Sequence, residues 1–597
     1  MRLTTRGTVR SKLAFEGLDK DIPYLGDIFS GALSHELDND SFTLAEEILR
    51  LAWTLGNEEK RTLALLVLAT FSSMRQGSTC LSLEGGVNGP LGKQLSSFFD
   101  SPTSREKQGR LRAVKKLVHE ESLSPIFGRP GDYRPLILDQ GKLYTHRHHS
   151  IEVALASAIS ARLRLELIPN TTITEPTGRL SEEQKSAVAT ALSTPLSLVT
   201  GGPGTGKTSI VSALVNTAIK SGTPTENIVL AAPTGKAASR LQDALQDSAN
   251  SPETKTVHRL LRYHSRTQQF RHNKANPVPF QLVIVDEASM VGMEIMKSLL
   301  EAMPPSATLV LLGDADQLPS VYVGSVFREL INVASIPTTR LSKNFRIQTG
   351  EKSGALLQHA TNEIAAGSCQ LLTNPPFFQG PDVDSVVVAK SLAQRALSKS
   401  LLLHPFDVTG ETLSDSSFDR FSKLSENQSR SKFLCVTRNG QRGAAGINAK
   451  CQQALHESND TNFRHGDPVI VLRNDYHRGL YNGDQGIVLE TTSRTGLSVV
   501  FGSDVAAQVF PLESIHNNIS LAFALTVHQS QVSEYEQITL VLPNQDIPLM
   551  TRELVYTAVT RARQTVSVIG DPSLLKAAAK RTVQRTSGLA ERITLKL

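Results

Sequence analysis

The sequence lacks the features that mark a membrane protein, a disulfide scaffold or a metal cage. No apolar run among its 597 residues reaches the roughly 18 residues of a membrane helix, and the best candidate, Leu63 to Phe71, has about half that length. The four cysteines are scattered without a C-x-x-C pair, which argues against disulfides and against a zinc or iron–sulfur site. The basic N-terminus lacks the apolar core of a secretory signal. We therefore expect a cytoplasmic protein without membrane contact.

Length and charge bound the organisation of the chain. A chain of this length is too long for one hydrophobic core, so about three or four folded units are expected. The net charge is +6, from 63 basic and 57 acidic residues, and the isoelectric point is about 9.0. This balance permits a polyanionic partner without requiring one.

The first 125 residues favour a helical unit. Leu44, Ile48 and Leu51 are spaced to fall on one helix face, and Leu63 to Phe71 continues as a buried helix. The Pro- and Gly-rich stretch 124–135 (SPIFGRPGDYRP) is expected to end this unit as a linker.

Short β-rich runs alternate with helical stretches from Leu196 onward. The runs LSLVT, IVLAA, LVIVD and TLVLLGD predict a parallel sheet covered by helices, with binding groups at the carboxyl ends of the strands. A later set, FLCVT, ITLVLP and VSVIG, predicts a second α/β unit. Between them, DPVIVLRND, YNGDQGIVLE, GLSVVFG and AQVFPLE alternate like antiparallel strands with Asn-Gly and Gly turns, which predicts a small inserted β-barrel.

A glycine-rich loop after the first of these strands predicts a phosphate site. Gly201, Gly206, Lys207 and Thr208 complete G-x4-G-K-T between a strand and a helix. Its backbone N–H groups and the helix N-terminus favour phosphate, Lys207 reaches the β- and γ-oxygens, and Thr208 ligates Mg²⁺. We expect the whole loop to bind ATP: Gly201, Gly202, Pro203, Gly204, Thr205, Gly206, Lys207, Thr208 and Ser209.

An acidic pair follows the run LVIV at the end of another strand. Asp286 can hold Mg²⁺ directly or through water, and Glu287 can orient or deprotonate the attacking water. An Asp-Glu pair alone is often a solvated helix start, but its position after a P-loop favours catalysis. The sequence thus predicts nucleotide hydrolysis.

The order of motifs resembles superfamily 1 DNA helicases, and within them the RecD-like group, the α subunit of exodeoxyribonuclease V. The similarity covers roughly residues 75–570 and rests on GGPGTGKT, AAPTGKAASRL, TVHRLL, VIVDEASMV, LVLLGDADQLPSV, YNGDQGIV, ALTVHQSQVSEYE and VYTAVTRAR. Upstream, GSTCLSL and PLILDQGKLYTHRHHSIE also resemble the group.

The resemblance assigns further roles around the nucleotide. Gln184 would read the adenine edge, and Gln317 would sense the γ-phosphate and relay its state to the DNA. Arg346 and Arg561 would reach from the second α/β unit onto the γ-phosphate, although a surface salt bridge is an alternative for Arg346. ATP binding would then close the cleft and hydrolysis would open it.

The same resemblance implies a track for DNA. The phosphate backbone would be gripped with little reading of bases, as sequence-independent movement requires. The residues implied are Thr234, Lys236, His258, Thr526, His528 and Ser530. One motif departs from the family pattern His-Lys-Ser-Gln-Gly-Ser-Glu, because Gln529 and Val532 stand at the lysine and glycine positions. If that glycine has a positive φ, valine there is costly, which puts DNA grip and coupling in doubt.

The implied architecture is α/β, with two RecA-like P-loop domains built on parallel sheets, a helical N-terminal domain and a small SH3-like β-barrel insertion. The expected bounds are 1–125 for the helical partner-binding domain and 126–345 for the first RecA-like ATPase domain. The second RecA-like domain would comprise 346–445 and 516–597, with the barrel at 446–515.

The resemblance implies an ATP- and Mg²⁺-dependent DNA helicase that moves 5′ to 3′ on single-stranded DNA. It would be the motor of a three-subunit helicase–nuclease complex that processes double-strand-break ends for recombinational DNA repair. Its partners would be DNA ends, a second helicase–nuclease subunit and a scaffold subunit. The modest length, without a long N-terminal extension, favours this form over a stand-alone helicase.

Three other interpretations remain. Histidines in THRHHS, at 145–150, could hold the metal of a cut-and-strand-transfer enzyme, but no matching nucleophilic Tyr with a third His is present, and a basic half-exposed strand is the preferred interpretation of His146 and His148. Gln529 and Val532 are also compatible with an ATPase switch that does not translocate. Cutting by this chain itself is not expected, because no Asp, Glu and Lys set resembles a two-metal nuclease centre.

Overall fold

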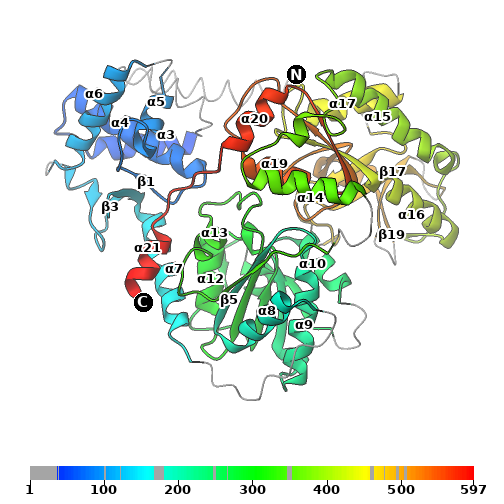
Figure 1. Ribbon diagram of the computed structural model, residues 1–597, viewed down its shortest axis with the longest axis horizontal. Coiled ribbons are helices and arrows are strands. Elements are labelled where there is room, and N and C mark those ends of the chain that lie inside the picture. The colour runs from blue at the N-terminus through cyan, green and yellow to red at the C-terminus, as the bar shows by residue number, and fades with distance from the viewer. Residues whose placement is uncertain are drawn as a thin grey trace.

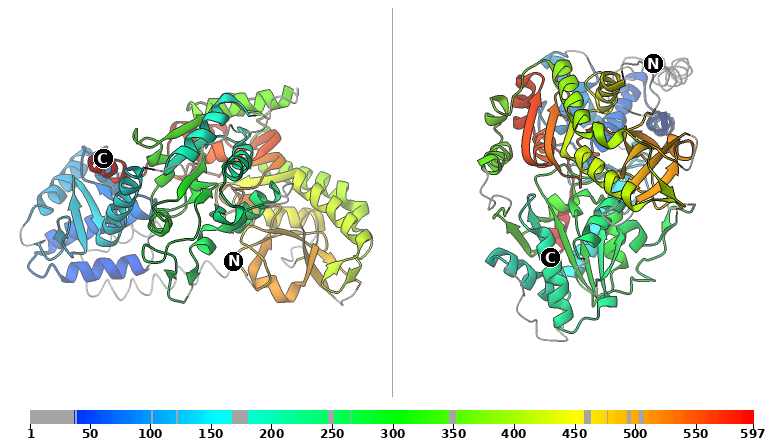
Figure 2. Two further views of the ribbon diagram at one scale, coloured as in Figure 1. Left: turned by 90° about the horizontal axis from the view of Figure 1, so that it is seen from below. Right: turned by 90° about the vertical axis from the view of Figure 1, so that its right-hand side faces the viewer.

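The computed structural model has three bodies, an N-terminal unit and two α/β lobes (Figure 1). The N-terminal unit lies beside the first α/β lobe, and the second α/β lobe faces another side of the first and carries an antiparallel sheet. The left view of Figure 2 places the N-terminal unit and the antiparallel sheet at opposite ends of the molecule. The structure describes residues 37, 39–99, 102–120, 123–166, 180–245, 251–264, 266–345, 352–456, 463–475, 477–492, 496–502 and 507–597.

The N-terminal unit packs helices against a small sheet. Its helices are α3 (Asn39–Arg50), α4 (Asn57–Arg75), α5 (Pro90–Ser97) and α6 (Ser104–Leu117). The sheet has the order β1 (Leu81–Ser82), β4 (Lys142–Thr145), β3 (Leu136–Asp139) and β2 (Phe127–Gly128). The run from Leu63 to Phe71 lies in α4 and is buried throughout, as the sequence predicts.

Two details of this unit differ from the sequence prediction. Ile48 is buried, but Leu44 and Leu51 are 50% and 43% exposed, because α3 turns Ala45 and Leu49 inward instead. The stretch 124–135 is not a linker, since β2 lies within it and Ile126 joins the core of the N-terminal unit. The boundary predicted between residues 125 and 126 therefore falls inside this core.

The first lobe is a parallel sheet buried on both faces. The strand order is β12 (Thr338–Leu341), β5 (Leu196–Gly201), β11 (Thr308–Gly313), β10 (Leu282–Val285), β6 (Ile228–Ala232) and β7 (Glu253–Thr256). Val283 and Ile284 enter different hydrophobic clusters, as alternation along a strand requires. The helices are α8 (Glu182–Ser193), α9 (Lys207–Lys220), α10 (Gly235–Asp243), α11 (Val257–Leu260), α12 (Met293–Ala302) and α13 (Val326–Leu330).

The second lobe has a smaller parallel sheet. Its order is β21 (Ala524–Thr526), β15 (Ser431–Cys435), β22 (Tyr535–Val541) and β23 (Ala562–Ile569). The helices are α14 (Lys352–Ala365), α15 (Val383–Ser398), α16 (Asp415–Arg430), α17 (Ala444–His456), α19 (Arg552–Val559) and α20 (Pro572–Lys580). Both predicted parallel sheets are therefore present.

The predicted inserted strands form most of one antiparallel sheet. β16 (Pro468–Val471), β17 (Gln485–Glu490), β18 (Leu497–Gly502) and β19 (Ala507–Pro511) lie within the predicted insertion. The sheet also includes strands from outside it, β13 (Val408–Thr409), β14 (Thr412–Leu413) and β20 (Ile519–Leu521). Helix α17, at the start of the predicted insertion, packs on α15 and β21 of the second lobe.

The chain end returns from the second lobe to the first. After α20, residues 581–588 lead to α21 (Leu589–Lys596), which packs on α7 (His146–Leu163), and Figure 1 shows this path as the red trace. We call residues 581–597 the strap. Because Leu589 and Ile593 join the hydrophobic cluster of the first lobe, the strap does not belong to the second lobe's core, where the sequence prediction placed it.

Candidate nucleotide cleft and nucleic-acid groove

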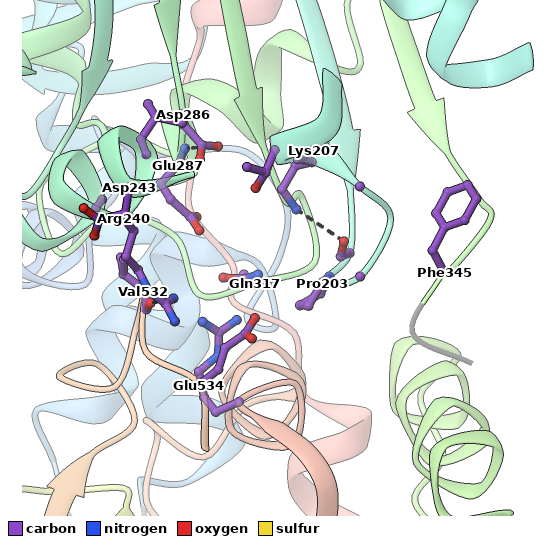
Figure 3. A pocket seen from close by; sticks show the side chains of 17 residues that line it. Pro203, Lys207, Arg240, Asp243, Asp286, Glu287, Gln317, Phe345, Val532 and Glu534 are labelled. Carbon is purple, nitrogen blue, oxygen red and sulfur yellow. Dashed lines mark hydrogen bonds between the residues drawn. The ribbon is translucent and has the colours of Figure 1, made fainter. Parts of the chain in front are cut away.

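A cavity of about 660 Å³ lies between the two lobes, a volume typical of small-molecule sites (Figure 3). It brings Lys207, Asp286, Glu287 and Gln317 of the first lobe together with Arg561 of the second. The other lining residues are Gly202, Pro203, Gly204, Gly206, Thr208, Ala237, Arg240, Leu241, Asp243, Phe345, Val532 and Glu534. Most of the predicted nucleotide residues therefore share one space.

The glycine loop has the conformation that phosphate binding needs. Gly204 and Gly206 have φ of 82° and 81°, values that disfavour other residues. Lys207 begins α9, and its Nζ donates to the carbonyl oxygen of Gly201 at 2.5 Å. Gly201, Thr205 and Ser209 do not line the cavity. Instead, the buried Thr205 hydroxyl donates to the carbonyl of Gly202 and stabilises the turn.

The acidic pair sits just beyond β10, facing the P-loop. The Asp286 carboxylate accepts a hydrogen bond from the backbone N–H of Glu287 at 2.8 Å. Burial and the adjacent Glu287 charge raise the pKa of Asp286, and the Lys207 charge opposes them. Glu287 has a φ of 52°, a strained value for a non-glycine residue. A half-buried carboxylate beside a second one suits a bound cation.

Gln317 is held by a carboxylate that the sequence analysis missed. Its Nε2 donates to Asp314 Oδ2 at 2.9 Å, and the Tyr556 hydroxyl of the second lobe donates to the same oxygen at 3.4 Å. Burial raises the pKa of Asp314. Asp314 therefore joins Gln317, a residue of the cavity wall, to the second lobe.

Arg561 reaches the cleft from the second lobe. It is 3% exposed, and its Nε donates to the carbonyl of Thr557 at 3.2 Å, which anchors the guanidinium at the cavity wall. Arg346 lies outside the described residues, so its role stays a prediction.

Gln184 is occupied by contacts within the first lobe. Its Oε1 accepts from the N–H of Ser181 at 2.9 Å, and its Nε2 donates to the carbonyl of Thr205 at 3.1 Å. It is 3% exposed and does not line the cleft, so its predicted contact with adenine stays a prediction.

The structure adds first-lobe and second-lobe charges that the sequence analysis did not select. Arg240 of α10 lines the cleft and donates to the carbonyl of Val532 across it. Glu534 also lines the cleft and pairs with Arg563 at 3.1 Å. In Figure 3, Glu534 and Val532 approach the cavity from the side opposite Asp286 and Lys207. The motif APTGKAASRL contains Arg240, but no spacing rule distinguishes it from a surface arginine.

A second cavity, of about 710 Å³, opens along the first lobe and the antiparallel sheet. We call it the groove. Thr234 and His258 line it together with Arg259, Arg262 and Tyr322, and its other lining residues include Tyr263, Asn474, Asn482 and Gln531. Tyr322 is 63% exposed and Tyr263 is 41% exposed. Cations and exposed aromatic rings together suit a nucleic-acid strand, since bases stack on rings and phosphates bind cations.

Other predicted DNA contacts are less available. Ser530 is fully buried and donates to the carbonyl of Val527 at 2.8 Å, so it cannot reach DNA in this conformation. Lys236 donates to Ser533 Oγ at 2.7 Å across the cleft, so its side chain contacts the other lobe. Burial lowers the pKa of Lys236 to about 8. Thr526 is buried too, and its hydroxyl bonds to the Gln529 side chain.

The backbone at the departure from the family pattern is strained. Val532 has a φ of 69°, so this position does use the left-handed region, where a β-branched residue is disfavoured. Its side chain packs with Ala232, Ala237 and Ala238 of the first lobe. Gln529 Oε1 accepts from both the N–H and the hydroxyl of Thr526, at 3.0 and 3.1 Å.

The histidine-rich segment forms the start of a helix. His146 and His148 belong to α7, which Thr145 caps, so the predicted strand was wrong. In the described part of the chain, no group of three or more His, Cys, Asp or Glu side chains is placed to hold a metal. Within the same residues, no helix combines the length and the apolar character that crossing a membrane requires.

Two segments match known domain families. Residues 184–323 match the AAA domain, and residues 521–569 match the UvrD-like helicase C-terminal domain. The first segment contains the P-loop and the acidic pair, and the second contains Val532 and Arg561.

Longer similarities extend over most of the chain. It is 32% identical over 567 residues to the RecBCD enzyme subunit RecD of Mycolicibacterium smegmatis, which is 90% of this chain and 95% of that protein. It is 33% identical over 426 residues to the ATP-dependent RecD2 DNA helicase of Deinococcus radiodurans, which is 69% of this chain and 52% of that protein. A crystal structure of Bacteroides Pif1 bound to single-stranded DNA aligns at 18% identity and a TM-score of 0.37, covering 67% of this chain and 96% of that one.

Proposed function

Because the chain belongs to the family of RecD subunits of the RecBCD enzyme, it is an ATP-hydrolysing DNA helicase, and we propose that it moves 5′ to 3′ on single-stranded DNA as a motor subunit. The complex would process double-strand-break ends for recombinational repair. It would contain a second helicase–nuclease subunit and a scaffold subunit. The N-terminal unit supplies none of the residues that line the nucleotide cleft, and it is the surface we propose for docking these subunits.

The main support for the proposal is a cleft in which both lobes place residues able to bind phosphate. Lys207, on the first lobe, and Arg561, on the second, line the same cavity. A nucleotide held there contacts both lobes, so its γ-phosphate sets how closely they approach. Arg561 would neutralise charge on the transferring phosphoryl group, and Glu287 would orient the attacking water.

The residues present also fit a magnesium ion. Thr208 and Asp286 line the cavity together, and desolvation and the adjacent Glu287 charge raise the pKa of Asp286, so a cation beside it would stabilise its charged form. We propose that these two residues hold Mg²⁺, which would neutralise phosphate charge when bound.

Helix α19 of the second lobe contacts the first lobe at two points. The backbone N–H of Leu318 donates to the Thr557 hydroxyl at 2.8 Å, and Arg328 pairs with Glu553 at 2.9 Å. Leu318 adjoins Gln317 of the cleft, and Tyr322 of the groove lies a few residues further along the same loop. Movement of the lobes would therefore shift this loop and, with it, the DNA strand bound in the groove. The small antiparallel sheet, which we interpret as SH3-like, forms the other wall of the groove.

A second candidate function is an ATPase switch that does not translocate. The strained Val532 and the internal contact of Gln529 favour it, because both lie in the motif that the family resemblance assigns to DNA coupling. Unwinding of a tailed duplex separates the two functions, since both would show DNA-stimulated ATP hydrolysis but only the motor would unwind.

ATP hydrolysis with and without single-stranded DNA tests the proposal. We expect stimulation by DNA in the wild type, and a loss of at least about 100-fold in Lys207→Ala, because the charge that holds the β- and γ-phosphates is removed. Lys220→Ala, at the exposed far end of α9, is the matched control and should keep wild-type turnover. Full turnover in Lys207→Ala, or no response of the wild type to DNA, would contradict the proposal.

A further inference from the structure

A third cavity, of about 420 Å³, lies where the N-terminal unit, the second lobe and the strap meet. Gln76 and Lys93 come from the N-terminal unit, and Leu318 and Pro319 come from the loop after Gln317. The second lobe and the strap supply the rest of the lining, which includes His528, Lys580, Arg581, Gln584 and Arg585. We call this cavity the basic port. Of its lining residues, His528 is the one that the family resemblance connects with DNA.

The charges around the basic port have one sign. Four cations, Lys93, Lys580, Arg581 and Arg585, line it together with His528, and its lining contains no Asp or Glu. Among the four cations, Arg581 has a salt bridge in the described structure, with Asp546 at 2.5 Å, and Asp546 lies outside the lining. The lining is therefore positively charged and would attract an anion.

Arg585 is the most enclosed of these cations. One guanidinium nitrogen donates to the carbonyl of Tyr322 at 3.2 Å, and its Nε is buried without a hydrogen-bond partner in the described structure. Burial, and then the charge of Arg328, lower the pKa of Arg585 to about 10, while the charge of Glu329 acts to raise it. Burial and the Arg585 charge also lower the pKa of His528. Both groups would be stabilised by an anion in the cavity.

The basic port continues the groove. Leu318 and Pro319 line the port, whereas Ser320, Val321 and Tyr322 line the groove, so one short loop forms a wall of both. A strand that lies on Tyr322 therefore needs only to cross this loop to enter the port. The loop starts at Gln317, which lines the nucleotide cleft, so a change at the cleft would act on both the groove and the port.

We propose that the basic port binds the phosphodiester backbone of single-stranded DNA where it passes beyond the two lobes. The proposal rests on the proposed function and extends it, because the strap and the N-terminal unit become part of the DNA track. A polyanion satisfies the repeated positive charge, and a strand of several phosphates matches a port continuous with the groove. Lys93 and Lys580 are exposed at its rim and would contact phosphates as they enter.

Salt-dependent binding of a labelled oligo(dT) series to the full chain tests this. In the double variant Lys93→Gln/Lys580→Gln, affinity for long oligonucleotides should fall by about three- to ten-fold at low salt. The slope of log affinity against log salt should become shallower by roughly 0.7 for each lysine. The shortest oligonucleotides that bind, which fill the groove alone, should be unaffected. Lys576→Gln, an exposed lysine of α20 outside the port, is the matched control.

Crosslinking gives a readout that does not depend on charge. All four native cysteines are buried, so a cysteine introduced at the exposed Gln584 can be labelled selectively with a benzophenone maleimide. The Gln584→Cys conjugate should crosslink to long single-stranded DNA, and the Lys576→Cys conjugate should not. Crosslinking should weaken when unlabelled oligo(dT) competes, but not when inorganic phosphate does.

The outcomes separate this proposal from the function on which it rests. If the wild type binds single-stranded DNA and responds to it in ATP hydrolysis, but the double variant keeps the wild-type affinity and salt slope, the basic port does not hold DNA. The same holds if the Gln584→Cys conjugate fails to crosslink, and a port that serves an acidic protein partner would give this result. If the wild type itself binds no DNA, the proposed function fails first.

Discussion

Val532 carries a β-branched side chain at a φ of 69°, where valine is costly, beside the nucleotide cleft. Such strain amounts to about 1–3 kcal/mol and persists only because surrounding contacts hold it. Here the contacts are its packing against Ala237 and Ala238 and the hydrogen bond from Arg240 to its carbonyl. Contacts between the two lobes therefore hold the strained backbone of Val532 in place.

Replacing Val532 by glycine or alanine should reverse the usual order of the two. In ordinary helix or strand positions glycine is less stable than alanine by about 0.5–1 kcal/mol. At this positive φ, Val532→Gly should instead be more stable than Val532→Ala by about 1 kcal/mol, since both lose the same packing but only glycine loses the strain. Unfolding midpoints in urea measure this difference. An alanine variant at least as stable as the glycine variant would show that the backbone is not strained.

Lys432 makes stability depend on pH. It is 2% exposed, its Nζ donates to the carbonyl of Ala522 at 2.7 Å, and burial, followed by the Lys236 charge, lowers its pKa from 10.5 to about 7. Between these two values the unfolded chain holds a proton that the folded chain has released. The free energy of unfolding should therefore rise with pH in this window, by up to about 1.4 kcal/mol per pH unit.

Lys432→Met isolates this contribution. The variant should be more stable than the wild type near pH 7, and the difference should shrink as the pH is raised toward 9.5. Denaturant midpoints of both proteins across this range provide the measurement. Parallel pH profiles for the two proteins would contradict burial of the lysine as the cause.

For single residues, the sequence predicts which side chains bind phosphate or a cation better than it predicts which residues contact each other across the lobes. Lys207 and Asp286 follow from motif spacing, because phosphate and cation binding need those residue types at strand ends. Asp314 and Arg240 could not be selected, since each acts through the opposite lobe, to which no local pattern refers. Ser530 shows the converse: the motif order predicts that it contacts DNA at the lobe rim, but in this conformation its side chain is buried.

Among the elements, the strap has no recognisable motif and yet joins three parts of the molecule. Glu152 of α7 is fully buried and accepts hydrogen bonds from the strap residues Ser587, at 3.0 Å, and Arg592, at 2.9 Å. It also accepts from Thr79 and Tyr144 of the N-terminal unit, at 2.5 and 3.0 Å. One carboxylate therefore fastens the strap to the N-terminal unit and to the first lobe.

Glu152→Gln should loosen the strap. An amide of the same size places an NH₂ group against donors, so buried hydrogen bonds are lost at a cost of about 2–4 kcal/mol. Trypsin should then cleave at Arg585 and Arg592 faster than in the wild type. Glu591→Gln, which removes an exposed partner of Lys142, is the control and should cost less than about 1 kcal/mol. Equal cleavage rates in the two variants would count against Glu152 as the anchor.

The sequence predicts helices and strands correctly where the apolar periodicity is long. The prediction fails where a strand pairs with a segment far away in the sequence. The parallel strands of both lobes and the buried helix α4 follow from apolar patterns. The antiparallel sheet gained β13 and β14 from a segment far upstream, a pairing that local alternation cannot reveal. The interpretation of His146 and His148 as part of a strand missed the cap at Thr145, which begins α7 immediately after β4.

At the scale of the whole molecule, a motor of this kind needs two lobes that respond to the nucleotide between them. Direct contacts already join the lobes, as in the Lys236 bond to Ser533. Each such contact is worth about 0.5–1.5 kcal/mol, so a bound triphosphate that engages both walls can shift their separation. The strap and the basic port would carry that shift to the N-terminal unit.

The distance between the lobes tests the central claim most directly. Cysteines introduced at the exposed Ser193 and Lys576, one in each lobe, can carry a fluorescence donor and acceptor, since the native cysteines are buried. A non-hydrolysable ATP analogue should shorten the distance relative to ADP when single-stranded DNA is bound, and Arg561→Gln should abolish this change while nucleotide binding persists. An unchanged distance in all nucleotide states of the wild type would contradict a motor driven by closure of the cleft.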